Sequence, residues 1–182
     1  MLKRVQYLTT VFIIILAMCQ TSCSVVIGGA LIKKKGLREL TVENGAIPPE
    51  FGVTDSTLVC IIRNRNGYDK HMKKHVANEY HGKHTFATWD EVDAGGEYGD
   101  VDSYRYVFSG DIREIDGGDN GPFMNTKMTT ESFYIYDRKD AKTYRSPFTS
   151  SFFAKVIQAY VINLEKERVK GSSSLQVRLK SD

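Results

Sequence analysis

The strongest folding signal in this chain is an amphipathic stretch near its carboxyl end. Its apolar residues recur at helical spacing and form a wide stripe: Phe153, Val156, Ile157, Tyr160, Val161 and Leu164. A helix with such a stripe has to bury it against another layer of structure. Pro147 blocks a helix upstream, residues 149–151 offer a cap, and Gly171 is expected to end the helix. The rest of the chain must therefore supply a surface for this helix to cover.

Short apolar and β-branched segments predict that this surface is a sheet. The run TLVCII at 57–62 is typical of a buried central strand, and Tyr104, Tyr106 and Phe108 alternate along a strand with one aromatic face. Further strands are expected at 85–92, 132–136 and 143–144. A second amphipathic helix, from Tyr68 to Tyr80, is expected to end at Gly82. This order predicts an α+β fold, a two-layer sandwich of a mostly antiparallel sheet with two helices on one face.

The first 23 residues have the layout of an export signal. Lys3 and Arg4 precede the apolar run VFIIILAM at 11–18, and polar residues then lead to Cys23. An apolar core this short does not span a bilayer comfortably and is typical of a secretory signal peptide.

The end of this segment resembles the lipobox of bacterial lipoproteins. Ser22 fits the position before the acylated cysteine, whereas Gln20 departs from the leucine that is usual three residues before it. Cys19 is the alternative, with Leu16 well placed but Met18 directly before it. The resemblance implies that Cys23 becomes the first mature residue and carries the acyl chains. The expected division is a signal peptide (1–22), a lipidated N-terminus and tether (23–54), an α+β domain (55–171) and a flexible tail (172–182).

Two other interpretations of the N-terminus remain open. Residues 11–32 could form an uncleaved membrane span closed by the lysines at 33–35. Alternatively, a plain cleaved signal peptide would leave Cys23 free to form a disulfide with Cys60 in an oxidising compartment. If Cys23 is acylated, Cys60 is expected to be a small buried hydrophobe. The lysines at 33–35 would then face anionic lipid headgroups.

All four histidines lie between Asn66 and His84. His71 and His75 are four residues apart, which allows two zinc ligands on one helix face. However, Met72 stands where a metalloprotease helix has its glutamate, and the lysines at 70, 73 and 74 oppose an arriving cation. We therefore predict solvated surface histidines, no metal and no cofactor. The acidic, glycine-rich loops at 93–102 and 116–121 are interpreted as turns rather than calcium loops.

Charge is separated along the chain although the total is only +3. Residues 63–84 hold six basic and two acidic residues, a net charge of +4, and residues 90–119 hold ten acidic and two basic residues, a net charge of −8. This asymmetry indicates either a partner-binding face or a basic helix docked over acidic loops of the same domain. A total charge of +3 gives no argument for a nucleic-acid partner.

The expected function is that of a lipid-anchored envelope protein acting as a binding or assembly module. The chain lacks a G-x-S-x-G elbow, a glycine-rich phosphate loop and a C-x-x-C motif, so no catalytic residue is predicted and the binding residues stay undefined. The hairpin FYIYDRKDAKTY and the closing helix resemble small periplasmic α+β domains of envelope lipoproteins, such as the curli-secretion lipoprotein and the lipoprotein activators of penicillin-binding proteins. That resemblance implies a protein or envelope-polymer partner at the periplasmic face. The alternative is a glycan hydrolase that uses paired acidic residues.

The lipobox resemblance generates the first testable prediction. Metabolic labelling with a fatty acid should mark the wild-type chain and should be lost in Cys23→Ala, because this substitution removes the acylated thiol. Cys19→Ala is the matched control and should keep the label. Label that survives in Cys23→Ala would show that Cys23 is not the modified residue.

Overall fold

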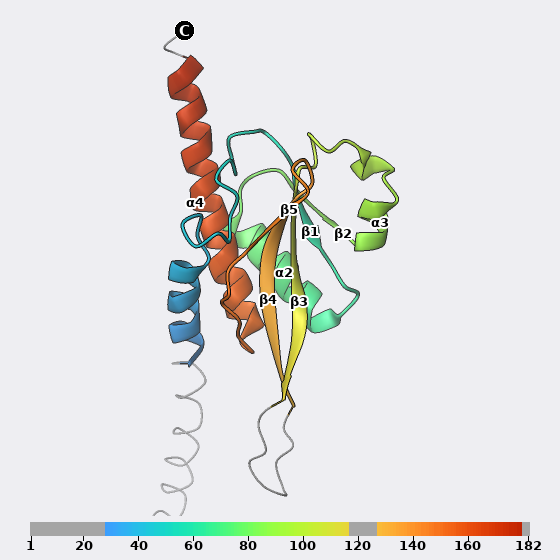
Figure 1. The fold of residues 1–182 in the computed structure, drawn as a ribbon, viewed down its shortest axis with the longest axis vertical. Coiled ribbons are helices and arrows are strands. Elements are labelled where there is room, and N and C mark those ends of the chain that lie inside the picture. The colour runs from blue at the N-terminus through green and yellow to red at the C-terminus, as the bar shows by residue number, and fades with distance from the viewer. Residues whose placement is uncertain (1–27, 117–126, 180–182) are drawn as a thin grey trace, which may run out of the picture.

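The computed structural model describes residues 28–116 and 127–179, in which one five-stranded sheet carries helices on both faces (Figure 1). The sheet has the strand order β2-β1-β3-β4-β5. The elements are β1 (Leu58–Ile61), α2 (Asn66–Glu79), β2 (His84–Ala87), α3 (Trp89–Asp93), the 3-10 helix η1 (Glu97–Gly99), β3 (Tyr106–Asp116), β4 (Lys127–Asp137), β5 (Lys142–Arg145) and α4 (Phe153–Leu179). Residues 28–39 form a further helix, named here the N-terminal helix. The predicted α+β class is confirmed.

Antiparallel pairing dominates the sheet, as predicted, but the sheet is mixed. The β3–β4 ladder joins eleven residue pairs and the β4–β5 ladder four, whereas β1 pairs in parallel with β2 over four residues and with β3 over two. The path from β1 to β2 runs through α2, and the path from β2 to β3 returns past β1 through α3. Right-handed crossovers in opposite directions place their helices on opposite faces of a sheet.

The side chains of β1 alternate between two apolar clusters on the two faces. Leu58 and Cys60 belong to the main core with α2 and α4, while Val59 and Ile61 pack in a second cluster with Val92 of α3. The strand is therefore buried on both sides, which explains why its sequence is an uninterrupted apolar run.

The helical layer on the main face consists of α2, α4 and the N-terminal helix. Most of the predicted stripe on α4 is fully buried, with Val156, Ile157, Tyr160, Val161 and Leu164 all inaccessible to solvent. In Figure 1 the N-terminal helix, in blue, runs alongside the first half of α4, in orange. The two predicted helices, α2 and α4, are confirmed on one face, where the N-terminal helix joins them, and α3 covers part of the opposite face.

The strand predicted at 85–92 is wrong beyond Ala87, because α3 begins at Trp89. Thr88 and Glu91 form a capping box in which the Glu91 N–H donates to Thr88 Oγ1 at 3.3 Å and the Thr88 N–H donates to Glu91 Oε2 at 2.7 Å. These two bonds satisfy backbone donors at the helix start and favour the turn of helix over a continued strand.

The tether predicted for residues 23–54 is corrected from residue 28 onward. Leu40, Ile47 and Phe51 are buried in the main core. The Tyr160 hydroxyl donates to the Ala46 carbonyl, and Glu50 forms an ion pair with Arg105 at 2.9 Å. The folded domain therefore begins well before residue 55. The predicted signal peptide (1–22) and Cys23 lie outside the described residues.

The flexible tail predicted for residues 172–182 is also corrected as far as residue 179, because α4 continues through Gly171 to Leu179 and residues 180–182 lie outside the described residues. Gly171 does not end the helix. It lies against the loop at Gly52, where a Cβ on Gly171 would be 2.4 Å from the Gly52 carbonyl carbon. Glycine is required here so that the helix and the loop backbone can approach each other closely.

This close approach generates the second prediction. Gly171→Ala should destabilise the fold by about 1–3 kcal/mol, because the new methyl group meets backbone that cannot rotate away. The matched control is Gly67→Ala in α2, where a Cβ has no neighbour within 4 Å. Alanine favours a helix over glycine by up to about 1 kcal/mol, so the control should be neutral or more stable. Urea unfolding of both variants tests this, and a Gly171→Ala protein as stable as wild type would contradict it.

Candidate functional site

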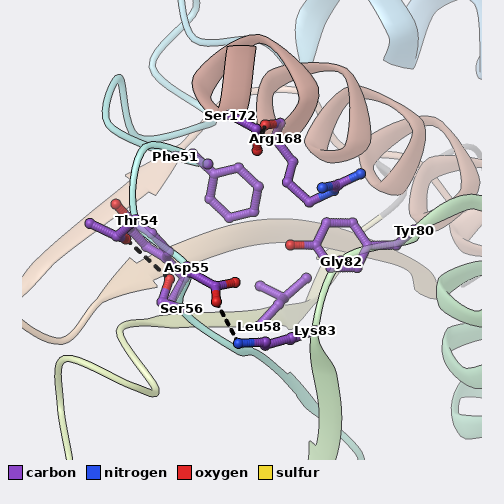
Figure 2. A pocket seen from close by; sticks show the side chains of 12 residues that line it. Phe51, Thr54, Asp55, Ser56, Leu58, Tyr80, Gly82, Lys83, Arg168 and Ser172 are labelled. Atoms are coloured by element: carbon purple, nitrogen blue, oxygen red, sulfur yellow. Dashed lines mark hydrogen bonds and ion pairs between the residues drawn. The ribbon is translucent and has the colours of Figure 1, made fainter. Parts of the chain in front are cut away.

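A pocket of about 280 Å³ opens between the loop before β1, the turn after α2 and the second half of α4. Twelve residues line it: Phe51, Gly52, Thr54, Asp55, Ser56, Leu58, Tyr80, Gly82, Lys83, Tyr106, Arg168 and Ser172. Figure 2 shows the Phe51 ring and the Arg168 side chain on the α4 side, with Leu58 and Lys83 across from them. The pocket is thus built from three segments far apart in the sequence.

The Phe51 wall is fixed by aromatic contacts and by one glycine. The Phe51 ring lies 5.0 Å from the Tyr106 ring and 6.5 Å from the Tyr80 ring, centre to centre. The next residue, Gly52, has a φ of +81°, and a Cβ there would be 2.4 Å from the Arg168 Cα. The loop can follow α4 only with glycine at this position. The apolar side of the pocket is therefore rigid and preformed.

Two ion pairs at the pocket neutralise its cations. Lys83 Nζ lies 2.5 Å from Asp55 Oδ2. Arg168 donates from Nε to Glu165 Oε2 at 2.8 Å and from Nη2 to Glu165 Oε1 at 2.6 Å. Burial opposes ionisation of Glu165, but these bonds and one from the His81 N–H lower its pKa overall. The Arg168 pKa is raised by the same bonds. Both groups are charged at neutral pH, and the pair carries no net charge.

Two hydroxyls that line the pocket lack a hydrogen-bond partner among the described residues, the buried Tyr106 hydroxyl and the Tyr80 hydroxyl. Figure 2 shows the Tyr80 hydroxyl oxygen directed between Phe51 and Leu58. Burial raises the pKa of Tyr80, so the phenol stays protonated and can both donate and accept. An aromatic wall, a free phenol and paired charges suit a small polar group without net charge.

The histidines are not the solvated surface pair that the sequence predicted. His75 is only 7% exposed, and His71 is partly buried with its ring edge-on to Phe153 of α4. Their rings stack 6.0 Å apart in the contact between α2 and α4. Among the described residues, no group of three or more His, Cys, Asp or Glu side chains is placed to hold a metal ion. The pair packs the helical layer together.

The two charged segments lie on opposite faces of the sheet. The lysines of α2 lie with the helical layer, while α3 and η1 cover the other face, where Tyr98 and Tyr104 pack. Arg138 from the β4–β5 turn holds the acidic loop by donating from Nη1 to the Tyr98 and Tyr104 carbonyls, at 2.7 and 3.1 Å. The basic helix is therefore not docked over the acidic loop at 93–102, whereas the loop at 116–121 lies outside the described residues from residue 117 onward. Asp100 Oδ1 accepts from the Asp102 and Ser103 N–H groups, as the turn interpretation of the loop at 93–102 requires.

The pocket residues were missed by the sequence interpretation. Phe51 fell in the predicted tether, and Arg168 and Tyr80 fell in the two predicted amphipathic helices without a binding role. The available signal was the glycine at position 52 directly after an apolar residue, which indicates a close backbone approach. Cys60 is buried, as expected for a small hydrophobe, and forms no disulfide among the described residues, while Cys23 lies outside them.

Comparisons with protein-family models, with curated proteins and with solved structures found no match. The structure itself defines an α+β domain, with a candidate ligand site beside α4. Within residues 28–116 and 127–179, none of the helices is long and apolar enough to cross a membrane.

The buried histidine generates the third prediction. Burial, His71 and Lys74 together lower the pKa of His75 to about 4, against an ordinary value of 6.5. Between these values the unfolded chain binds a proton that the folded chain does not. The stability that neutral His75 contributes to the fold is therefore fully present above pH 6.5 and is lost as the pH falls towards 4. At 1.36 kcal/mol per pKa unit, the loss in the free energy of unfolding is at most about 3 kcal/mol.

Urea unfolding between pH 7.5 and pH 4 tests this prediction. The loss of stability on acidification should be smaller in His75→Gln than in wild type. His81→Gln is the matched control, because the His81 side chain is 70% exposed. The same pH dependence in His75→Gln as in wild type would contradict the prediction.

Proposed function

We propose that this chain is a binding module held at the surface of a bacterial membrane by its N-terminal segment. The pocket beside α4 receives a small, uncharged polar group of an envelope partner, either a protein or an envelope polymer. Attachment through an acyl group on Cys23 is part of the proposal and rests on the lipobox resemblance, with the periplasmic face as its location.

The binding proposal rests on which polar groups of the pocket already have a partner and which do not. The two cations at its wall, Lys83 and Arg168, are each paired with a carboxylate, and the Tyr80 phenol is left free beside the Phe51 ring. Pockets with an apolar wall and a few placed polar groups recognise ligands by shape and hydrogen bonding. A volume of about 280 Å³ fits a group the size of one side chain or one sugar ring.

The pocket does not favour the alternative of a glycan hydrolase. Such an enzyme needs two carboxyl groups on either side of the scissile bond. Asp55 is the one carboxylate among the residues that line the pocket, and it is paired with Lys83. Binding is therefore the function that this site supports best.

Site-specific photocrosslinking in the native envelope tests the proposal. A benzophenone amino acid replaces Thr54 at the pocket, and the matched control carries it in place of Thr143, an equally exposed threonine on β5. We expect one defined crosslinked species from position 54 and not from position 143. Mass spectrometry of that species identifies the partner as protein or polymer.

A second substitution ties the capture to the pocket. Tyr80→Phe removes the free hydroxyl, and a net hydrogen bond of about 0.5–1.5 kcal/mol corresponds to a loss of about 2- to 12-fold in crosslinking yield below saturation. Tyr136→Phe, on the other face of the sheet, should leave the yield unchanged. Equal products from positions 54 and 143, or a yield that Tyr80→Phe does not alter, would contradict the proposed site.

A further inference from the structure

Exposed lysines lie on three neighbouring segments of the helical layer, the N-terminal helix, α2 and the first turn of α4. This surface, named here the basic end, consists of Lys34 and Lys35 from the N-terminal helix, Lys70 and Lys74 from α2, and Lys155 from α4. Among the described residues, none of these five amino groups lies within ion-pair distance of a carboxylate. Their charge therefore remains available to an external partner.

Lys155 connects the three segments into one surface. Its side chain passes 3.4 Å from the Cβ position of Gly29 in the N-terminal helix. On its other side it acts together with Lys70 and Lys74 on His71 of α2, and these charges add to burial in lowering the pKa of His71. Like charges gathered in this way repel one another, and anions placed over them relieve that repulsion.

Two exposed apolar side chains lie at the same end. Leu31 is 62% exposed and Phe152, directly before α4, is 39% exposed. The Phe152 ring is 3.6 Å from the position that a Cβ on Gly28 would take. Phe152 therefore lies beside the start of the N-terminal helix, which also carries Leu31. Exposed apolar residues among lysines are the composition of surfaces that lie in a membrane interface.

We infer that the basic end lies against an anionic lipid surface, with its lysines on the headgroups and Leu31 and Phe152 at the headgroup boundary. The inference rests on the proposed attachment of the N-terminal segment to a membrane. Cys23 precedes Gly28 by five residues, which span at most about 18 Å when fully extended. An acyl group at Cys23 would therefore keep this end of the domain close to the bilayer.

The opposite end of the molecule has a different charge arrangement. Two of its lysines are paired, Lys139 with Asp102 and Lys170 with Glu167, at 2.7 and 2.6 Å. An anionic bilayer therefore attracts the basic end more strongly, and the domain takes one orientation. The pocket then faces away from the lipid, because Arg168 lies about 20 Å along α4 from Lys155 at 1.5 Å per residue.

Lipid photocrosslinking with the full chain in vesicles tests this orientation. A benzophenone amino acid replaces Phe152, and the matched control carries it in place of Val169, which is also apolar and exposed but lies about 26 Å farther along the same helix. The vesicles contain equal parts of phosphatidylglycerol and phosphatidylcholine, or phosphatidylcholine alone. We expect lipid adducts from position 152 in the anionic vesicles and few from position 169, and we expect 1 M salt to reduce them.

Charge removal gives the quantitative part of the test. Each lysine near an anionic surface raises the equilibrium constant for binding that surface roughly fivefold. Lys34→Gln, Lys70→Gln and Lys155→Gln together should therefore shift the orientation equilibrium about a hundredfold and largely abolish lipid adducts at position 152. The control removes the same charge at the other end through Lys139→Gln, Lys142→Gln and Lys170→Gln, and should keep the adducts.

The outcomes separate this inference from the anchor on which it rests. Three results would overturn the inference that the basic end lies on lipid. These are equal adducts from both vesicle types, adducts that survive the first triple substitution, and adducts to protein alone in native envelopes. Acyl labelling is measured on the same samples. A missing acyl label with intact lipid adducts would contradict the anchor at Cys23 and leave the surface supported, whereas an intact label without lipid adducts would contradict the surface alone.

Discussion

Burial of the apolar stripe on α4 is the constraint on which the rest of this structure depends. The sheet covers only part of that stripe, and α2 and the N-terminal helix cover the remainder. Asn163, near the middle of α4, shows how closely these parts fit, because its buried side-chain amide donates to the Leu37 carbonyl at 3.1 Å and to the Leu40 carbonyl at 2.7 Å. Those carbonyls end the N-terminal helix and would otherwise be buried without a donor.

Ion pairs secure the far edge of the same assembly. Arg105 is buried beside Asp137, with Nε donating to Oδ1 at 3.0 Å and Nη2 to Oδ2 at 2.8 Å, and it also reaches Glu50 and Asp140. The hydrogen bonds that Arg105 donates to Asp137 are the main cause of the raised Arg105 pKa, so the guanidinium stays charged. A buried guanidinium is tolerated because several carboxylates surround it. One residue thus ties β3, the β4–β5 turn and the loop before β1 together.

Periodicity in the sequence was enough to predict the elements that bury one face. The stripe on α4, the helix from Tyr68 and the apolar run of β1 each carry a local pattern that tertiary structure did not override. The segment at 40–51 has no such pattern, since its burial depends on Tyr160 and Asn163 more than a hundred residues later. Gly171 was read by its usual role at a helix end, whereas here it makes room for Gly52. The pocket was unpredictable for the same reason, because it exists only where three distant segments meet.

The length of α4 has a consequence for binding if the start of the helix contacts a surface and its second half lines the pocket. One helix carries Lys155 near its start and Arg168 at the pocket, in a single continuous run of hydrogen-bonded turns. A helix cannot be shortened or stretched without breaking those bonds, so the distance between Lys155 and Arg168 is fixed. If the basic end rests on a lipid surface, as inferred above, the helix fixes the distance of the pocket from that surface and so sets how near to it a ligand must come.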